Sequence, residues 1–127
     1  MRRIGFPHVL AFVGGTFTFV LGIWAFVSPS SFYDALATYP PYNRHFLHDI
    51  GAFQAGLGAA LLATLVLRDA LFAGLAGFAV GSVLHAAAHA IDAGTGGRST
   101  DPWLLAAFAA MMVVALVLRA RELRRQR

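Results

Sequence analysis

Four long apolar runs place the strongest constraint on how this chain can fold. They cover roughly residues 4–27, 45–67, 70–91 and 102–118. Each run approaches or exceeds the ~17–20 residues that an α-helix needs to cross a hydrocarbon core of ~30 Å. Only 13% of the residues are charged, whereas about one-quarter of a soluble domain is charged. The sequence therefore predicts an all-α fold: one domain over residues 1–127, a polytopic membrane four-helix bundle.

The distribution of arginine indicates how the bundle is oriented. The chain has ten basic residues and all of them are arginine. With both termini in the cytoplasm, Arg44 and Arg98 lie outside, and the other eight lie inside: Arg2, Arg3, Arg68, Arg119, Arg121, Arg124, Arg125 and Arg127. Cytoplasmic segments carry an excess of basic residues, so we expect an N-in/C-in protein with a basic tail over residues 119–127. The net charge of +4 then reflects topology and does not indicate a nucleic-acid partner.

The connections between the runs are of two kinds. The first, "SPSSFYDALATYPPYN", is long enough for residues 31–37 to form a short helix on the membrane surface. The second consists of Arg68 and Asp69 alone, so the second and third helices are predicted to form a tight antiparallel hairpin. Residues equally far from that turn should lie at the same height.

Small residues are expected to hold this hairpin together. One four-residue ridge contains Gly56 and Ala60, and a matching ridge contains Gly77 and Gly81. Small side chains let two helix backbones approach closely in lipid. The matched heights therefore predict a packing seam between the second and third helices.

Beyond the seam, ionisable residues gather toward the predicted extracytoplasmic end. The second helix begins with His45, His48 and Asp49, and the stretch "GSVLHAAAHAIDAG" ends the third with His85, His89 and Asp92. Ionisable residues in a membrane helix are functional-site candidates by default. We therefore predict one polar site between these helices.

Three chemistries remain open for this site. Histidines from both helices could bind a transition metal such as zinc, copper or iron, with His48, His85 and His89 as ligands and His45, Asp49 or Asp92 completing or orienting the shell. Haem ligation by two facing histidines is a second, less favoured reading. The groups could also relay protons, or hydrogen-bond a quinone or lipid head group. Structural His–Asp pairs that only hold the helices together are the alternative to all three.

Several enzyme classes fit the sequence poorly, and no catalytic residue is assigned. The chain has no cysteine, which excludes thiol catalysis and thiolate metal sites. Membrane desaturases and hydroxylases use more histidines, placed toward the cytoplasm. Four-helix dihaem cytochromes need axial histidines near both membrane faces. The sequence thus favours a binding protein over an enzyme.

Several short motifs resemble a known family. The segments "GIWAFVSPSSFYD" and "HDIGAFQAGLGAALL", a short basic turn and a fourth helix that ends in arginines are similar to small four-helix DoxX-like membrane proteins. The resemblance implies a four-helix membrane fold, and some members are associated with quinone-linked oxidation. High arginine and alanine contents without lysine indicate a bacterium, and hence its cytoplasmic membrane. An accessory subunit, in a homo-oligomer or a larger membrane complex, is the alternative to a ligand-binding protein.

Overall fold

The computed structural model describes residues 4–67 and 70–126, and every regular element within these ranges is a helix. The elements are α1 (Phe6–Val27), α2 (Pro29–Ala35), α3 (Arg44–Ala63), α4 (Leu71–Ile91) and α5 (Asp101–Arg125). Four of them, α1, α3, α4 and α5, are long and apolar enough to cross a membrane. The four predicted long helices are therefore confirmed, within a few residues at most ends.

The clearest difference in extent concerns α5. The apolar pattern ends near residue 118, but the helix continues to Arg125. Arginine, leucine, alanine and glutamate are all good helix formers, and Arg119 Nη1 forms an ion pair with Glu122 Oε2 at 3.0 Å. The segment expected as a basic tail is thus a helical extension of the last span.

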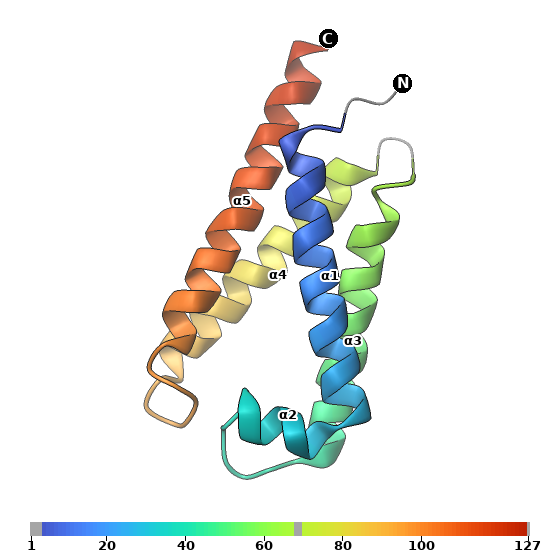
Figure 1. The fold of residues 1–127 in the computed structure, drawn as a ribbon. Coiled ribbons are helices and arrows are strands. Elements are labelled where there is room, and N and C mark those ends of the chain that lie inside the picture. The colour runs from blue at the N-terminus through green and yellow to red at the C-terminus, as the bar shows by residue number, and fades with distance from the viewer. Residues whose placement is uncertain (1–3, 68–69, 127) are drawn as a thin grey trace.

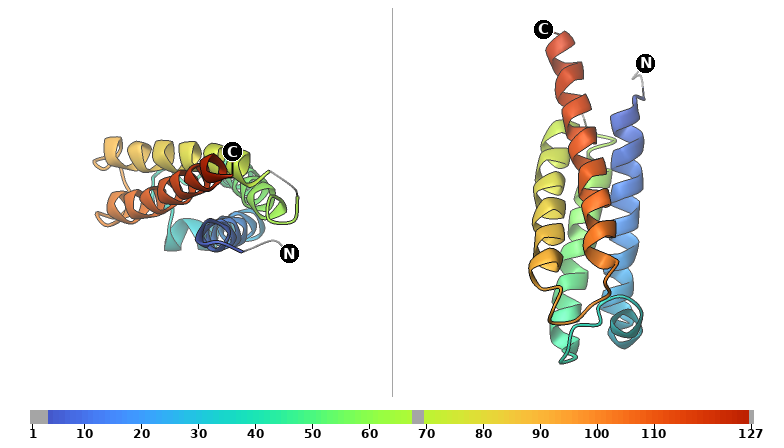
Figure 2. Two further views of the ribbon diagram at one scale, coloured as in Figure 1. Left: turned by 90° about the horizontal axis from the view of Figure 1, so that it is seen from above. Right: turned by 90° about the vertical axis from the view of Figure 1, so that its left-hand side faces the viewer.

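The long helices share one elongated arrangement with two distinct ends. The first turn of α1 and the last turn of α5 lie together at one end, which we call the terminal end; α2 and residues 92–100 lie at the other, which we call the loop end (Figure 1). Seen from above, α4 and α5 run side by side and spread away from α1 and α3 toward the loop end (Figure 2). The bundle therefore consists of two helix pairs that separate along their length.

The pair α1–α3 forms the closest helix contact. A β-carbon at Gly22 would lie 2.7 Å from the Gly51 carbonyl oxygen and would also collide with the Ala55 backbone nitrogen. A β-carbon at Gly58 would lie 2.5 Å from the Phe19 nitrogen. These glycines allow the two backbones to touch, as small residues do where membrane helices pack closely.

The predicted seam between α3 and α4 is wrong. A β-carbon at Gly56 or Gly77 would meet nothing within 4 Å, and one at Gly81 would meet only Leu57, at 3.8 Å. Gly56, Ala60 and Gly77 are exposed. For close packing α3 uses another face, turned toward α1, where Gly51 and Ala55 meet Gly22 and Gly58 meets Gly15.

The buried core is small and lies toward the terminal end. Its members come from four helices: Leu10, Ala11, Leu61, Leu71, Leu75, Phe78, Ala79, Met112 and Ala115. At the loop end, a separate cluster of Ala25, Phe32 and Leu47 fixes α2 against α1 and α3. Trp24 supports α2 as well, since its indole nitrogen donates to Ser31 Oγ at 3.2 Å. The predicted short helix is therefore present, and it begins at Pro29 because proline is favoured in a first helical turn.

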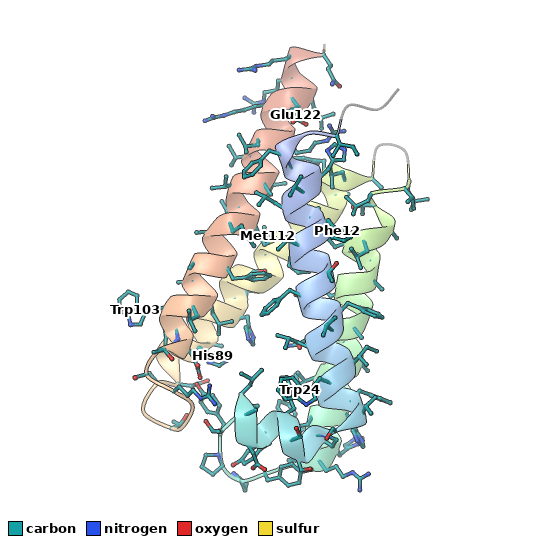
Figure 3. The ribbon with its side chains drawn as sticks, in the orientation of Figure 1. Phe12, Trp24, His89, Trp103, Met112 and Glu122 are labelled. Atoms are coloured by element: carbon teal, nitrogen blue, oxygen red, sulfur yellow. The ribbon has the colours of Figure 1, made fainter. Side chains whose placement is uncertain are left out.

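Most large apolar side chains lie on the outside of the molecule. Val27, Phe53 and Leu104 are 74%, 78% and 67% exposed, and Trp103 points away from the bundle (Figure 3). Soluble monomers rarely expose contiguous apolar surface on this scale. This exterior is suited to contact with the lipid bilayer.

Candidate functional site

The inward stripe of α4 changes character halfway along the helix. Leu71, Leu75 and Phe78 are almost fully buried. With the same alternating spacing of four and three residues, which keeps side chains on one face, the stripe continues as Ser82, His85 and His89. Toward the loop end, a stripe that begins as core therefore presents hydrogen-bonding groups.

The polar half of the stripe is not packed as the apolar half is. Ser82 and His89 are partly exposed and His85 is exposed. This follows from the divergence of the two helix pairs, because no neighbouring helix covers α4 at this level as closely as it does at Leu75. His85 and His89 thus face inward without being buried.

Three side chains form the centre of the site, which we call the His85–His89–Tyr39 group. The rings of His85 and His89 lie 4.8 Å apart between centroids. Tyr39, from the segment between α2 and α3, stands edge-on to His89 with centroids 5.3 Å apart. Its hydroxyl lies 3.1 Å from His89 Nδ1, within hydrogen-bonding distance. Figure 3 shows His89 near the loop end of α4. The group thus joins the two helix pairs where they are farthest apart.

Two loops hold Tyr39 in place. The Gly97 nitrogen donates to the Thr38 carbonyl oxygen at 3.0 Å, and the Arg98 guanidinium donates to the Ala35 carbonyl oxygen. Gly97 has φ +75°, a backbone conformation that is unfavourable for residues other than glycine. A β-carbon there would also lie 2.6 Å from the Tyr39 hydroxyl. We use the name strap for three contacts: Gly97 with Thr38, Arg98 with Ala35, and Tyr39 with His89.

The surroundings of Tyr39 determine its protonation. Burial raises the pKa of the Tyr39 phenol, and the carboxylates of Asp101 and Asp92 raise it further. The hydroxyl therefore keeps its proton over the physiological range. In the neutral tautomer of His89 that carries its proton on Nε2, this hydroxyl donates to Nδ1. The second nitrogen of His89 is then a hydrogen-bond donor for a ligand.

The Tyr39→Phe variant tests this hydrogen bond. We expect neutral His89 to lose its single-tautomer preference, and the free energy of unfolding to fall by about 1 kcal/mol, the usual net contribution of one hydrogen bond. Nitrogen NMR shifts of the imidazole report the tautomer directly. Tyr42→Phe is the matched control, because the Tyr42 ring contacts Tyr33 and leaves His89 untouched. An unchanged His89 spectrum in Tyr39→Phe would contradict the assignment.

The other predicted site residues lie elsewhere at the loop end. The His48 ring packs on Phe26 of α1, with centroids 5.3 Å apart. His45 and Asp49 pair with each other along α3 at 3.5 Å, with side chains 87% and 56% exposed. Asp92 ends α4 and acts on Tyr39 through its charge. The structure therefore brings His85 and His89 together but turns the three α3 residues away from them.

This division bears on the predicted metal shell. Within residues 4–67 and 70–126, no group of three or more His, Asp or Glu side chains is arranged to hold a metal ion. The shell of His48, His85 and His89 is not assembled, because His48 faces α1. The same placement removes His48 as a partner of His89 across a haem. Two adjacent imidazoles remain, which suit hydrogen bonding better than a closed metal site.

The site predicted from sequence does not include two polar residues of the inward surface. Tyr39 precedes Pro40, which favours an extended backbone, but no spacing shows that it reaches α4. Gln54 shares a stripe of α3 with buried Gly51 and Gly58, a spacing that could have placed it inward. Its Oε1 is buried and finds no partner in the described part of the chain.

Over the residues that the structure describes, the fold is all-helical, with four membrane-length helices and a Tyr–His–His group at one end. Comparison with known protein families, characterised proteins and solved structures found no match to this chain. Its function is therefore argued from its own residues.

Proposed function

We propose that this protein binds a small molecule through the His85–His89–Tyr39 group. The observation that carries the proposal is the convergence of two imidazoles and a phenol on the inward face of an otherwise apolar helix. Ionisable residues in a membrane helix are functional-site candidates by default. A few convergent polar groups with apolar surroundings are typical of small-molecule sites.

We also propose where the protein and its site lie relative to the membrane. The protein crosses the bacterial cytoplasmic membrane four times with both termini inside, as the arginine distribution favours. The His85–His89–Tyr39 group then lies near the extracytoplasmic surface. The resemblance to DoxX-like proteins supports the same four-helix membrane class, and no catalytic role is assigned to any residue.

Co-purification tests the binding function. The protein is purified in mild detergent, extracted with organic solvent and water, and both extracts are analysed by mass spectrometry. We expect a molecule in near-stoichiometric amount that falls about tenfold or more in the His85→Ala/His89→Ala double variant, since losing about 1.4 kcal/mol of binding lowers affinity tenfold. His45→Ala is the control, because His45 is highly exposed and pairs with Asp49. Equal amounts in all three proteins would overturn the proposal.

Elemental analysis and an absorption spectrum of the same samples separate the other chemistries. A stoichiometric zinc, copper or iron ion that depends on His85 and His89 would mean that the ligand is a metal ion and not a small molecule. A haem absorption band would indicate a redox component. Either result would contradict small-molecule binding as proposed here.

Assembly with another chain is a second candidate function, and one observation favours it. Exposed small residues, among them Ala52, Gly56 and Ala60, follow one face of α3, and Gly56 has nothing within 4 Å of its β position. Such a face suits close packing by another membrane helix. Loss of a dimer or larger species on size-exclusion chromatography of Gly56→Leu, with wild-type co-purification, would assign assembly to this face and binding to the site.

A further inference from the structure

The contact between α3 and α4 is closer at the terminal end than toward the loop end. At the terminal end, a β-carbon at Gly74 would lie 2.5 Å from Thr64 Cγ2. Two turns further, a β-carbon at Gly81 would lie 3.8 Å from Leu57 Cδ2. His85, the next residue on this side of α4, is exposed. The two helices therefore diverge beyond Gly81, and His85 lies just past the point of divergence.

The loop end itself is tied across by the strap. Gly97 bonds to Thr38, Arg98 bonds to Ala35, and Tyr39 contacts His89. These contacts connect residues 35–39 with residues 89–98 at the loop end of the site. The loop end of the site is therefore crossed by polar contacts.

The side between α3 and α4 has the opposite character. Phe53, Val80 and Leu84 flank the divergence and are 78%, 60% and 65% exposed. Gln54 and Ser82 lie further in, on the inward stripes of the two helices, and Gln54 Oε1 has no hydrogen-bond partner among the residues described. An apolar margin with hydrogen-bonding groups behind it suits a molecule that has both kinds of surface.

We propose that the ligand is a membrane-dissolved amphiphile that reaches His85 sideways, between α3 and α4. This inference rests on the proposed binding function and names its ligand class and route. The polar head of the ligand binds the His85–His89–Tyr39 group. Its apolar body lies along Phe53, Leu57 and Leu84, in continuity with the surrounding lipid.

Spin labelling tests the route, and the absence of cysteine makes single-site labelling direct. Ser82→Cys carries a nitroxide on the inward stripe, Val80→Cys carries one on the outer margin, and Thr95→Cys carries one at the exposed loop end. All are measured in lipid nanodiscs against oxygen, which concentrates in the bilayer, and a water-soluble nickel chelate. We expect the ratio of oxygen to nickel collision rates at position 82 to match position 80 and to exceed position 95.

A blocking variant sharpens the test. Gly81→Leu adds a side chain where the gap to Leu57 is narrow, so the oxygen collision rate of the label at position 82 should fall while that at position 80 stays unchanged. A label at position 82 that collides with nickel as readily as position 95 would overturn the lateral route. A label that meets neither reagent would also overturn it.

The test of the lateral route and the co-purification test of the binding function can fail separately. A co-purified molecule that depends on His85 and His89 but partitions into water would overturn the amphiphile assignment and leave small-molecule binding intact. Conversely, lateral oxygen access with no co-purified molecule would overturn the binding function, and the ligand class with it, and would leave only the lateral route. A molecule recovered in the organic phase, together with lateral access at position 82, is the result we expect.

Discussion

Gly22→Leu should prevent α1 and α3 from packing and should be the most damaging single change in the chain. Even a β-carbon at this position would lie 2.7 Å from the Gly51 carbonyl oxygen and would collide with the backbone of Ala55. Backbone atoms of a regular helix cannot rotate away as a flexible side chain can. We expect the free energy of unfolding to fall by at least about 3 kcal/mol, the upper part of the range for overpacked cores.

The measurement is thermal or denaturant unfolding in detergent, followed by helix signal and by size-exclusion chromatography. Gly56→Leu in α3 and Gly77→Leu in α4 are the controls, because a β-carbon at either position would meet nothing within 4 Å. Smaller changes at these sites give a second comparison: Gly56→Ala and Gly77→Ala should gain up to about 1 kcal/mol from helix propensity. If Gly22→Leu unfolded like the controls, the contact between α1 and α3 would not be as close as described.

The second large effect is expected from Gly97→Ala. For a residue with a side chain, the left-handed backbone at φ +75° costs about 1–2 kcal/mol of conformational free energy. The added methyl group would also lie 2.6 Å from the Tyr39 hydroxyl. We therefore expect the strap to open, and Tyr39 to leave His89.

Trypsin cleavage measures the opening of the strap. Arg98 is held through its bond to the Ala35 carbonyl oxygen, so cleavage after Arg98 should become faster in Gly97→Ala, while cleavage after Arg44 at the start of α3 should not change. Gly94→Ala is the control, since nothing lies within 4 Å of its β position. Equal cleavage after Arg98 in Gly94→Ala and Gly97→Ala would contradict this account of the strap.

The long helices could be predicted from sequence because their cause is local. An apolar run of membrane length has few alternatives to a helix, since backbone polar groups must be paired within the segment. Local spacing did not decide which helices pack closely through their small residues. Gly56 and Ala60 have the four-residue spacing of a packing ridge, as do Gly51 and Ala55, and only the geometry of four helices decides which face of α3 meets which neighbour.

The site was predictable to the extent that it lies on one helix. His85 and His89 are four residues apart, so one turn of α4 brings them together. His48 required a correct register and rotation of α3, and it lies against Phe26 instead. Tyr39 required the path of two loops, which depends on the backbone of Gly97 and on contacts between segments far apart in the chain.

The pairing of α1 with α3, and of α4 with α5, also has a consequence for how the protein is made. Membrane helices form individually and associate afterwards. Gly15 and Gly22 of α1 meet the backbone of α3, whereas Gly14 faces only side chains of α5, so the first half of the molecule can complete its tightest backbone interface while the second half is still being translated. The α4–α5 pair then joins a finished partner, and its docking forms the terminal-end core as the last step of assembly.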